Sequence, residues 1–329
     1  MKKNHLLAAT LIIMSGTFCQ KAWPYDYNKV FNQSYSIFNY DVDNKADIIL
    51  YEAMDAAAEN YDAVRGVALV TRTGSSKLIA DACFDKCLED SDYCISALES
   101  MPIEIGALMQ PLTVMGALED GVLSSVEQTF STAPYCGLRN VHNIGESISI
   151  REAIASSSNT PVLRSVLDDS KYESLIEAMN VAHSIAGYGV TASPEELLRV
   201  YDAIAAGGVA DSTVICAPET ALALRRCLSE CISSSYGTGK YLRNGYVDIA
   251  GKTATTYPRE QNTYNTDQKI LSFVGYFPAD KPQYTCIVVM QCRGNSHQAA
   301  MDVFKRFAIG ITAPEIDYDS LSNSADIAE

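Results

Sequence analysis

The sequence has little positive charge. Its 25 lysines and arginines are outnumbered by 40 aspartates and glutamates, which gives the 329 residues a net charge of −15. An acidic surface repels phosphate backbones and anionic lipid headgroups, so we expect no nucleic acid and no anionic membrane surface as a partner. The sequence also lacks a glycine-rich phosphate loop, internal repeats and low-complexity linkers. A hydrophobic fraction of 47% nevertheless suffices for a substantial core.

A long apolar run is also missing near the N-terminus. Lys2 and Lys3 precede an apolar stretch, Leu6–Met14, which is shorter than the ~20 residues that span a bilayer. We therefore expect no integral membrane span. A basic start, a short apolar stretch and then small and polar residues are typical of an export signal. This pattern predicts a signal peptide over residues 1–22 and a periplasmic or cell-envelope protein. In an alternative interpretation Cys19 is a lipidated cysteine, although the bulky Phe18 before it disfavours lipoprotein processing.

Patterns that bind metals are missing too. No Cys-x-x-Cys pair occurs, and none of the four histidines lies near a cysteine cluster, so we expect neither a metal nor a cofactor. The ten cysteines include a cluster of Cys83, Cys87 and Cys94, and a pair, Cys227 and Cys231, four residues apart. Loss of Cys19 with the signal leaves an odd number. For an exported protein this composition predicts disulfides and at least one free thiol.

Hydrophobic periodicity predicts strands near both ends of the chain. Short apolar segments at Gly66–Val70 and Leu78–Cys83 flank a turn, and Ile270–Phe277 and Tyr284–Gln291 form a second pair. The segments between these pairs have helical spacing instead. Separation of strands from helices is typical of an α+β protein with an antiparallel sheet.

Helices are predicted mainly from their starts and their apolar faces. Two capping boxes, Ser149 with Glu152 and Ser193 with Glu196, mark helix starts. Other helices are expected at Ala46–Tyr61, from Leu108 to about Gly121, and at Ser296–Phe307. We expect one domain over residues 46–310, followed by an acidic, disordered tail over residues 314–329.

Several motifs occur in an order that resembles a known family. Lys252-Thr253-Ala254 lies on a predicted strand, Ile249–Thr255, and follows Gly237–Lys240. Ser157-Ser158-Asn159 and Gln110–Val122 precede them. In this order the motifs resemble the transpeptidase domain of penicillin-binding proteins, in the superfamily of the serine β-lactamases. The resemblance covers about Ala46 to Phe307 and implies an antiparallel β-sheet flanked by helices, with an all-helical lobe.

The resemblance fails at the residues that carry the family's chemistry. Acylation needs a serine nucleophile and, one helical turn later, a lysine that receives its proton. The alignment puts Ala107 at the serine position, Gln110 at the lysine position and Ala254 at the glycine of the third motif. No Ser-x-x-Lys occurs elsewhere in the chain. The resemblance therefore implies a pseudo-transpeptidase.

Four polar residues of the family's pattern remain. By resemblance, Ser157 relays a proton and Asn159 holds a ligand amide, while Lys252 and Thr253 bind a carboxylate by charge-assisted hydrogen bonds. An ordinary helix end and an exposed strand edge are the alternative interpretations. If the alignment is right, these residues line one cleft together with Ala107 and Gln110, and a peptidoglycan peptide or a β-lactam is the expected ligand.

Three functions remain open from the sequence. The leading hypothesis is an exported, inactive homologue that binds peptidoglycan stem peptide or a cell-wall protein. The second is an active D,D-transpeptidase, carboxypeptidase or penicillin-binding enzyme with another nucleophile, such as Ser157, Thr253 or a cysteine. The third is a protein-interaction scaffold whose cleft plays no part.

Overall fold

The computed structural model describes residues 43–75, 77–86, 102–142, 144–172, 174–260, 263–294 and 296–313. The predicted signal peptide, the predicted acidic tail, Cys87 and Cys94 lie outside these ranges. Every helix within them is too short or too polar to cross a bilayer.

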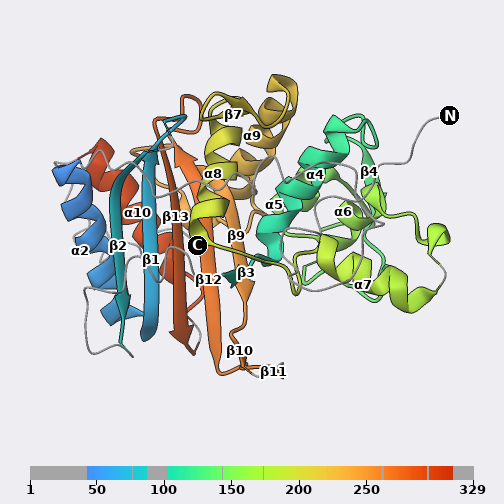
Figure 1. Ribbon diagram of the computed structural model, residues 1–329, viewed down its shortest axis with the longest axis horizontal. Coiled ribbons are helices and arrows are strands. Elements are labelled where there is room, and N and C mark those ends of the chain that lie inside the picture. The colour runs from blue at the N-terminus through green and yellow to red at the C-terminus, as the bar shows by residue number, and fades with distance from the viewer. Residues whose placement is uncertain are drawn as a thin grey trace.

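A five-stranded antiparallel sheet forms the centre of the protein, in the order β2-β1-β13-β12-β9 (Figure 1). The two ends of the chain meet in it, because β1 pairs with β13 and Val67 lies opposite Val289. This arrangement confirms the predicted α+β class and both predicted strand pairs. The strands are β1 Ala63–Arg72, β2 Leu78–Asp85, β9 Ala250–Thr256, β12 Gln268–Phe277 and β13 Tyr284–Arg293.

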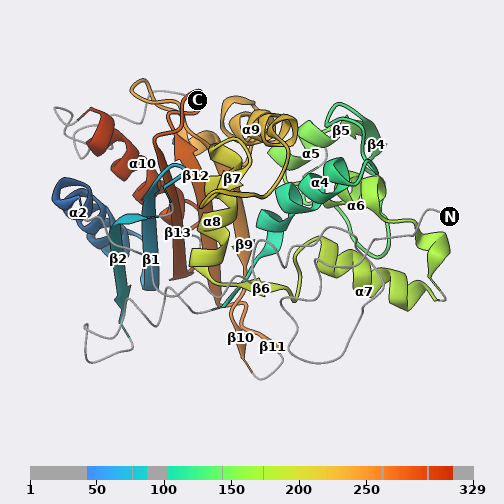
Figure 2. The same ribbon diagram turned by 45° about the horizontal axis from the view of Figure 1, so that its top comes forward.

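Helices cover both faces of this sheet. The helices α2 (Asn44–Asn60) and α10 (Ala299–Thr312) pack together on one face, and α8 (Pro194–Ala205) packs on the other (Figures 1 and 2). Phe273 of β12 meets Phe304 of α10 edge to face, with ring centroids 4.7 Å apart. Because both faces are covered, the central strands are almost wholly apolar, unlike the alternating strands of a half-exposed sheet.

A helical lobe lies beside the β9 edge of the sheet (Figure 1). The helix α9 packs against β9 and also against α4, α5 and α8, so it joins the lobe to the sheet. The lobe comprises α4 Met109–Glu119, α5 Ile150–Ala155, α6 Asn159–Val166, α7 Leu175–Ile185 and α9 Pro218–Ser233.

Short elements complete the fold. Four two-stranded ribbons pair β3 Ile103–Glu104 with β6 Thr191–Ala192, β4 Thr129–Ser131 with β5 Ser147–Ser149, β7 Val209–Ala210 with β8 Thr213–Val214, and β10 Arg259–Glu260 with β11 Thr263–Tyr264. Single 3₁₀ turns occur at η2 Gly106–Leu108, η3 Asp169–Lys171 and η4 Lys240–Leu242.

The structure confirms the predicted free thiols: five buried cysteines form no disulfide, and the predicted disulfides stay a prediction for the other cysteines. Each of the five is a buried free thiol, because none has a second sulfur close enough for a disulfide. Burial in apolar surroundings also raises the pKa of Cys231 to about 11, so this thiol is a poor nucleophile. The five are Cys216, Cys227, Cys231, Cys286 and Cys292. No group of three potential metal ligands occurs in the described ranges.

Both predicted capping boxes are present. At α8, the Glu196 backbone N–H donates to Ser193 Oγ over 3.1 Å, and the Ser193 backbone N–H donates to the Glu196 carboxylate over 2.8 Å. Pro194 occupies the first helical position, where its missing N–H removes no hydrogen bond.

We predict that Ser193→Ala lowers the free energy of unfolding by about 1 kcal/mol, because an amide of the first turn of α8 loses its acceptor. Urea denaturation of the purified protein measures the change. Ser193→Asp keeps an acceptor and should stay close to the wild type. Equal stability of all three proteins would show that this box contributes nothing measurable.

Candidate functional site

Lys252 lies on β9, at the edge of the sheet that faces the lobe. Its side chain is fully buried, and its ammonium group donates hydrogen bonds to Ser157 Oγ and, over 3.2 Å, to the Thr253 carbonyl. No carboxylate in the described ranges forms an ion pair with it. Lys252 is therefore a buried cation held by neutral oxygens, not the exposed lysine of an ordinary strand edge.

Burial lowers the pKa of Lys252 from its usual 10.5 to about 8. The physical cause is desolvation, which disfavours the charged form of an amine, and the nearby Cys231 thiol opposes this change only weakly. A substantial neutral fraction is therefore present at mildly alkaline pH. An anionic ligand would supply the missing counter-charge.

Ser157 reaches Lys252 from a strained turn between α5 and α6. Its backbone φ of +55° is in the left-handed region, which costs a residue with a side chain about 1–2 kcal/mol. The next hydroxyl, that of Ser158, points elsewhere and bonds to Ser156 Oγ at 2.9 Å. Strain of this kind is often retained at functional sites.

Asn159 and Gln110 form a buried pair between α6 and α4. The Gln110 amide nitrogen donates to Asn159 Oδ1 over 2.8 Å, and the two side chains are 1% and 8% exposed. This bond occupies the position where the family's pattern has a lysine. The other polar atom of Gln110, the carbonyl oxygen Oε1, is buried and has no hydrogen-bond partner.

Ala107 lies in η2, which packs against β9. The preceding Gly106 has a φ of +54°, and a Cβ added there would lie 2.6 Å from Thr256 Cγ2 and 3.7 Å from the Ala254 methyl group. Only glycine therefore fits between the turn and the strand. Ala254 itself is 6% exposed, and β9 continues through it without interruption.

Thr253 bonds to a residue that the sequence analysis did not assign to the site. Its hydroxyl donates to Thr238 Oγ1 over 2.7 Å. Thr238 belongs to the Gly237–Lys240 motif. The sequence therefore offered a signal for it, but we used that motif only for its place in the order of motifs and assigned no role to the Thr238 side chain. The hydroxyls of both threonines now lie together beside β9.

The structure thus brings the three predicted segments together. Gln110 contacts Asn159, Lys252 contacts Ser157, and the backbone beside Ala107 packs against the strand that carries Ala254. The assembled groups are hydroxyls, two side-chain amides and one buried amine. Position 107 carries a methyl group and position 110 an amide, where the motif pattern has a serine and a lysine.

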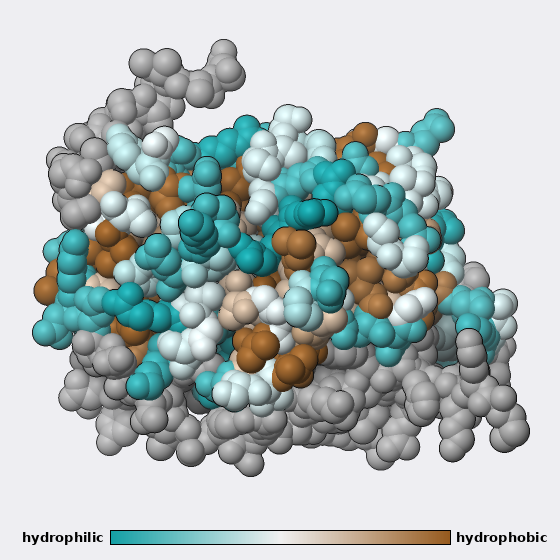
Figure 3. Space-filling view, turned by 90° about the horizontal axis from the view of Figure 1, so that it is seen from above, coloured by the Kyte–Doolittle hydropathy of each residue, from teal (hydrophilic) through white to brown (hydrophobic). Residues whose placement is uncertain are grey.

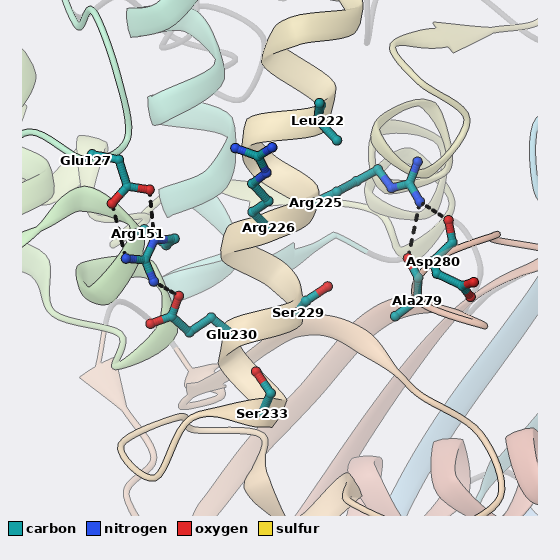
Figure 4. Close-up of a pocket in the computed structure, with 10 residues that line it drawn as sticks. All are labelled: Glu127, Arg151, Leu222, Arg225, Arg226, Ser229, Glu230, Ser233, Ala279 and Asp280. Carbon is teal, nitrogen blue, oxygen red and sulfur yellow. Dashed lines mark hydrogen bonds and ion pairs between the residues drawn. The ribbon is translucent and has the colours of Figure 1, made fainter.

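A separate groove of about 520 Å³ runs along the outward face of α9. At one end Arg151 bridges Glu127 and Glu230, and at the other Arg225 donates to the Ala279 and Asp280 carbonyls (Figure 4). None of the residues predicted for the site lines it. Its ion pair ties α5 to α9 within the lobe, and Arg225 ties α9 to the loop after β12, so we assign the groove to the junction of lobe and sheet.

Comparisons with known proteins identify the fold. Residues 168–308 match the family model of the penicillin binding protein transpeptidase domain. The chain resembles the TP domain of penicillin-binding protein 3 from Burkholderia pseudomallei at 20% identity, with a TM-score of 0.68 over 81% of this chain and 93% of that one. The transpeptidase domain of the FtsI4 D,D-transpeptidase from Legionella pneumophila is 19% identical, with a TM-score of 0.63 over 84% of this chain and 99% of that one. Penicillin-binding protein 3 from Mycobacterium tuberculosis, complexed with aztreonam, is 17% identical, with a TM-score of 0.69 over 83% of this chain and 78% of that one.

The protein therefore has the penicillin-binding transpeptidase fold, as its motifs predict. The matched residues include Lys252 and Thr253 but start after Ala107, Gln110 and the 157–159 turn, whose assignment rests on the alignment of motifs and the contacts above. A comparison with curated proteins gives no match.

We predict that Lys252→Met raises the free energy of unfolding by about 1–3 kcal/mol at pH 7, because it removes an uncompensated buried cation. The folded pKa, about 8, is below the unfolded value of 10.5. The unfolded chain therefore binds more protons between these values, and wild-type stability rises with pH across that window. The advantage of the variant should shrink over the same range.

Denaturation from pH 7 to 10.5 measures this prediction. The matched variant Lys240→Met removes an exposed lysine and should leave the pH profile unchanged. A Lys252→Met protein that is less stable than the wild type at pH 7 would contradict the prediction.

Proposed function

We propose that the protein is an exported, catalytically inactive relative of the penicillin-binding proteins that binds the carboxylate end of a peptidoglycan stem peptide. Its ligand-binding residues are Lys252, Thr253 and Asn159, with Ser157 positioning the lysine. The observation that carries the proposal is the Gln110–Asn159 hydrogen bond. It gives the position of the catalytic base to a neutral amide, next to an alanine at the position of the nucleophile.

The burial of Lys252 supports a binding function over a scaffold whose cleft is unused. A fully buried lysine with no ion pair destabilises the fold, and natural sequences tolerate such costs mainly where function needs them. On the face seen from above, apolar side chains form separate groups among hydrophilic ones (Figure 3). Among the described residues on that face, the apolar groups are therefore interrupted by hydrophilic side chains and give no specific support to protein docking.

The activity prediction is that the mature protein forms no covalent adduct with a fluorescent penicillin. Without a hydroxyl at 107 and an amine at 110, no group at the usual positions can attack the β-lactam carbonyl. Denaturing gel electrophoresis after incubation measures adduct formation. Ala107→Ser combined with Gln110→Lys is the gain-of-function control, and slow labelling of this variant would support the alignment.

A second candidate function has one specific observation in its favour. The Lys252 amine contacts Ser157 Oγ, and its pKa of about 8 lets part of it act as a base at neutral to alkaline pH. In that case Ser157 Oγ attacks the carbonyl and its proton moves to neutral Lys252 Nζ; the C–N bond then breaks as Lys252 returns this proton to the amide or lactam nitrogen. Wild-type labelling by penicillin that Ser157→Ala removes would establish this enzyme and overturn the inactive one.

Reversible binding is predicted to depend on Lys252. Saturable binding of an acetylated peptide that ends in D-Ala-D-Ala, measured by calorimetry, should fall at least tenfold in Lys252→Ala, because a charge-assisted hydrogen bond to the carboxylate is lost. Lys240→Ala is the matched control and should bind like the wild type. Equal affinity in the wild type and Lys252→Ala would favour the scaffold.

A further inference from the structure

The unpartnered carbonyl oxygen of Gln110 shows what the site lacks. Oε1 is buried without a hydrogen bond, while the nitrogen of the same amide is held by Asn159 Oδ1 at 2.8 Å. A buried acceptor without a donor is unfavourable, and turning the amide over would break its bond to Asn159 Oδ1. The site is therefore complete only when something donates a hydrogen bond to Gln110.

Substitution of lysine by glutamine also reverses the polarity of this position. A lysine ammonium only donates hydrogen bonds, whereas a glutamine carbonyl accepts them. A ligand that meets Gln110 Oε1 must therefore present an N–H or O–H group, where a ligand of a lysine ammonium presents an acceptor. This requirement belongs to the present chain and not to the family pattern.

The second unmatched group, Lys252, lies close by. Gln110 bonds to Asn159 and Lys252 bonds to Ser157, and the Cα atoms of these two partners are at most about 7.6 Å apart, since neighbouring Cα atoms are separated by ~3.8 Å. Lys252 requires an acceptor of negative charge, and Gln110 requires a donor. The C-terminal residue of a peptide carries both, a carboxylate and a backbone N–H, on one Cα atom.

We propose that Gln110 is a specificity-determining residue that accepts a hydrogen bond from the backbone N–H of the ligand's C-terminal residue while Lys252 holds its carboxylate. This inference rests on the proposed binding function and adds to it that the ligand must end in an amide-linked residue. An ester-linked terminus has an oxygen in place of the N–H. That oxygen cannot donate, and its lone pairs face those of Gln110 Oε1.

The test compares two ligands that differ in this one group. Acetyl-D-Ala-D-Ala and the ester analogue acetyl-D-Ala-D-lactate are titrated into the mature protein by calorimetry. We expect the amide to bind roughly tenfold to a hundredfold more tightly. Gln110→Met has a similar volume but no acceptor, so it should bind the two ligands within about twofold of each other.

Two controls keep the result specific. Gln291→Met removes a glutamine amide on β13, which donates to Gln268, and should retain the wild-type preference. Because the amide and ester are also compared in the wild type, equal binding there overturns the inference whether or not a variant folds.

Each outcome is distinct. A preference that Gln110→Met removes and Gln291→Met retains supports the inference. Equal binding of both ligands to the wild type overturns it and leaves the proposed function standing, as does a preference that Gln110→Met retains. Binding of neither ligand overturns the proposed function and, with it, this inference.

Discussion

The hydrogen bond between Lys252 and Ser157 is the contact on which the site depends. It joins the edge strand of the sheet to the turn between two helices of the lobe, so it fixes the relative position of the two parts where they meet. It does so with a buried cation and a strained backbone, both of which destabilise the protein when no ligand is bound. A purely structural contact between sheet and lobe would be more stable if it were apolar.

The three departures from the family's pattern act at different levels. The alanine at 107 removes a reacting atom and leaves the backbone in place, because the glycine before it still packs against β9. The glutamine at 110 replaces a charge by a neutral hydrogen bond to Asn159. The alanine at 254 adds a methyl group in the region that the backbone turn approaches. A serine hydroxyl and a lysine amine are thus absent at 107 and 110, while the backbone around these positions still packs against β9.

Much of the fold was predictable because its signals are local. The strand pairs follow from apolar runs around turns, and the helix starts at Ser149 and Ser193 follow from side chains that bond within the same turn. A count of cysteines, by contrast, could not say which of them form disulfides. Whether two sulfurs meet depends on how distant segments pack, and Cys227 and Cys231 instead remain separate thiols in the core.

The sequence by itself determined the order of the motifs and the missing hydroxyl and amine at 107 and 110, since residue types are independent of packing. Tertiary structure alone decided that Lys252 is buried without a counter-ion and that its pKa falls. It also decided that the side-chain oxygen of Gln110 is buried without a hydrogen-bond donor, while the nitrogen of the same amide donates to Asn159. These properties depend on which atoms of α4, α6 and β9 meet. The contacts that set them join residues 49 and 95 positions apart, and no local pattern in the chain encodes their distances.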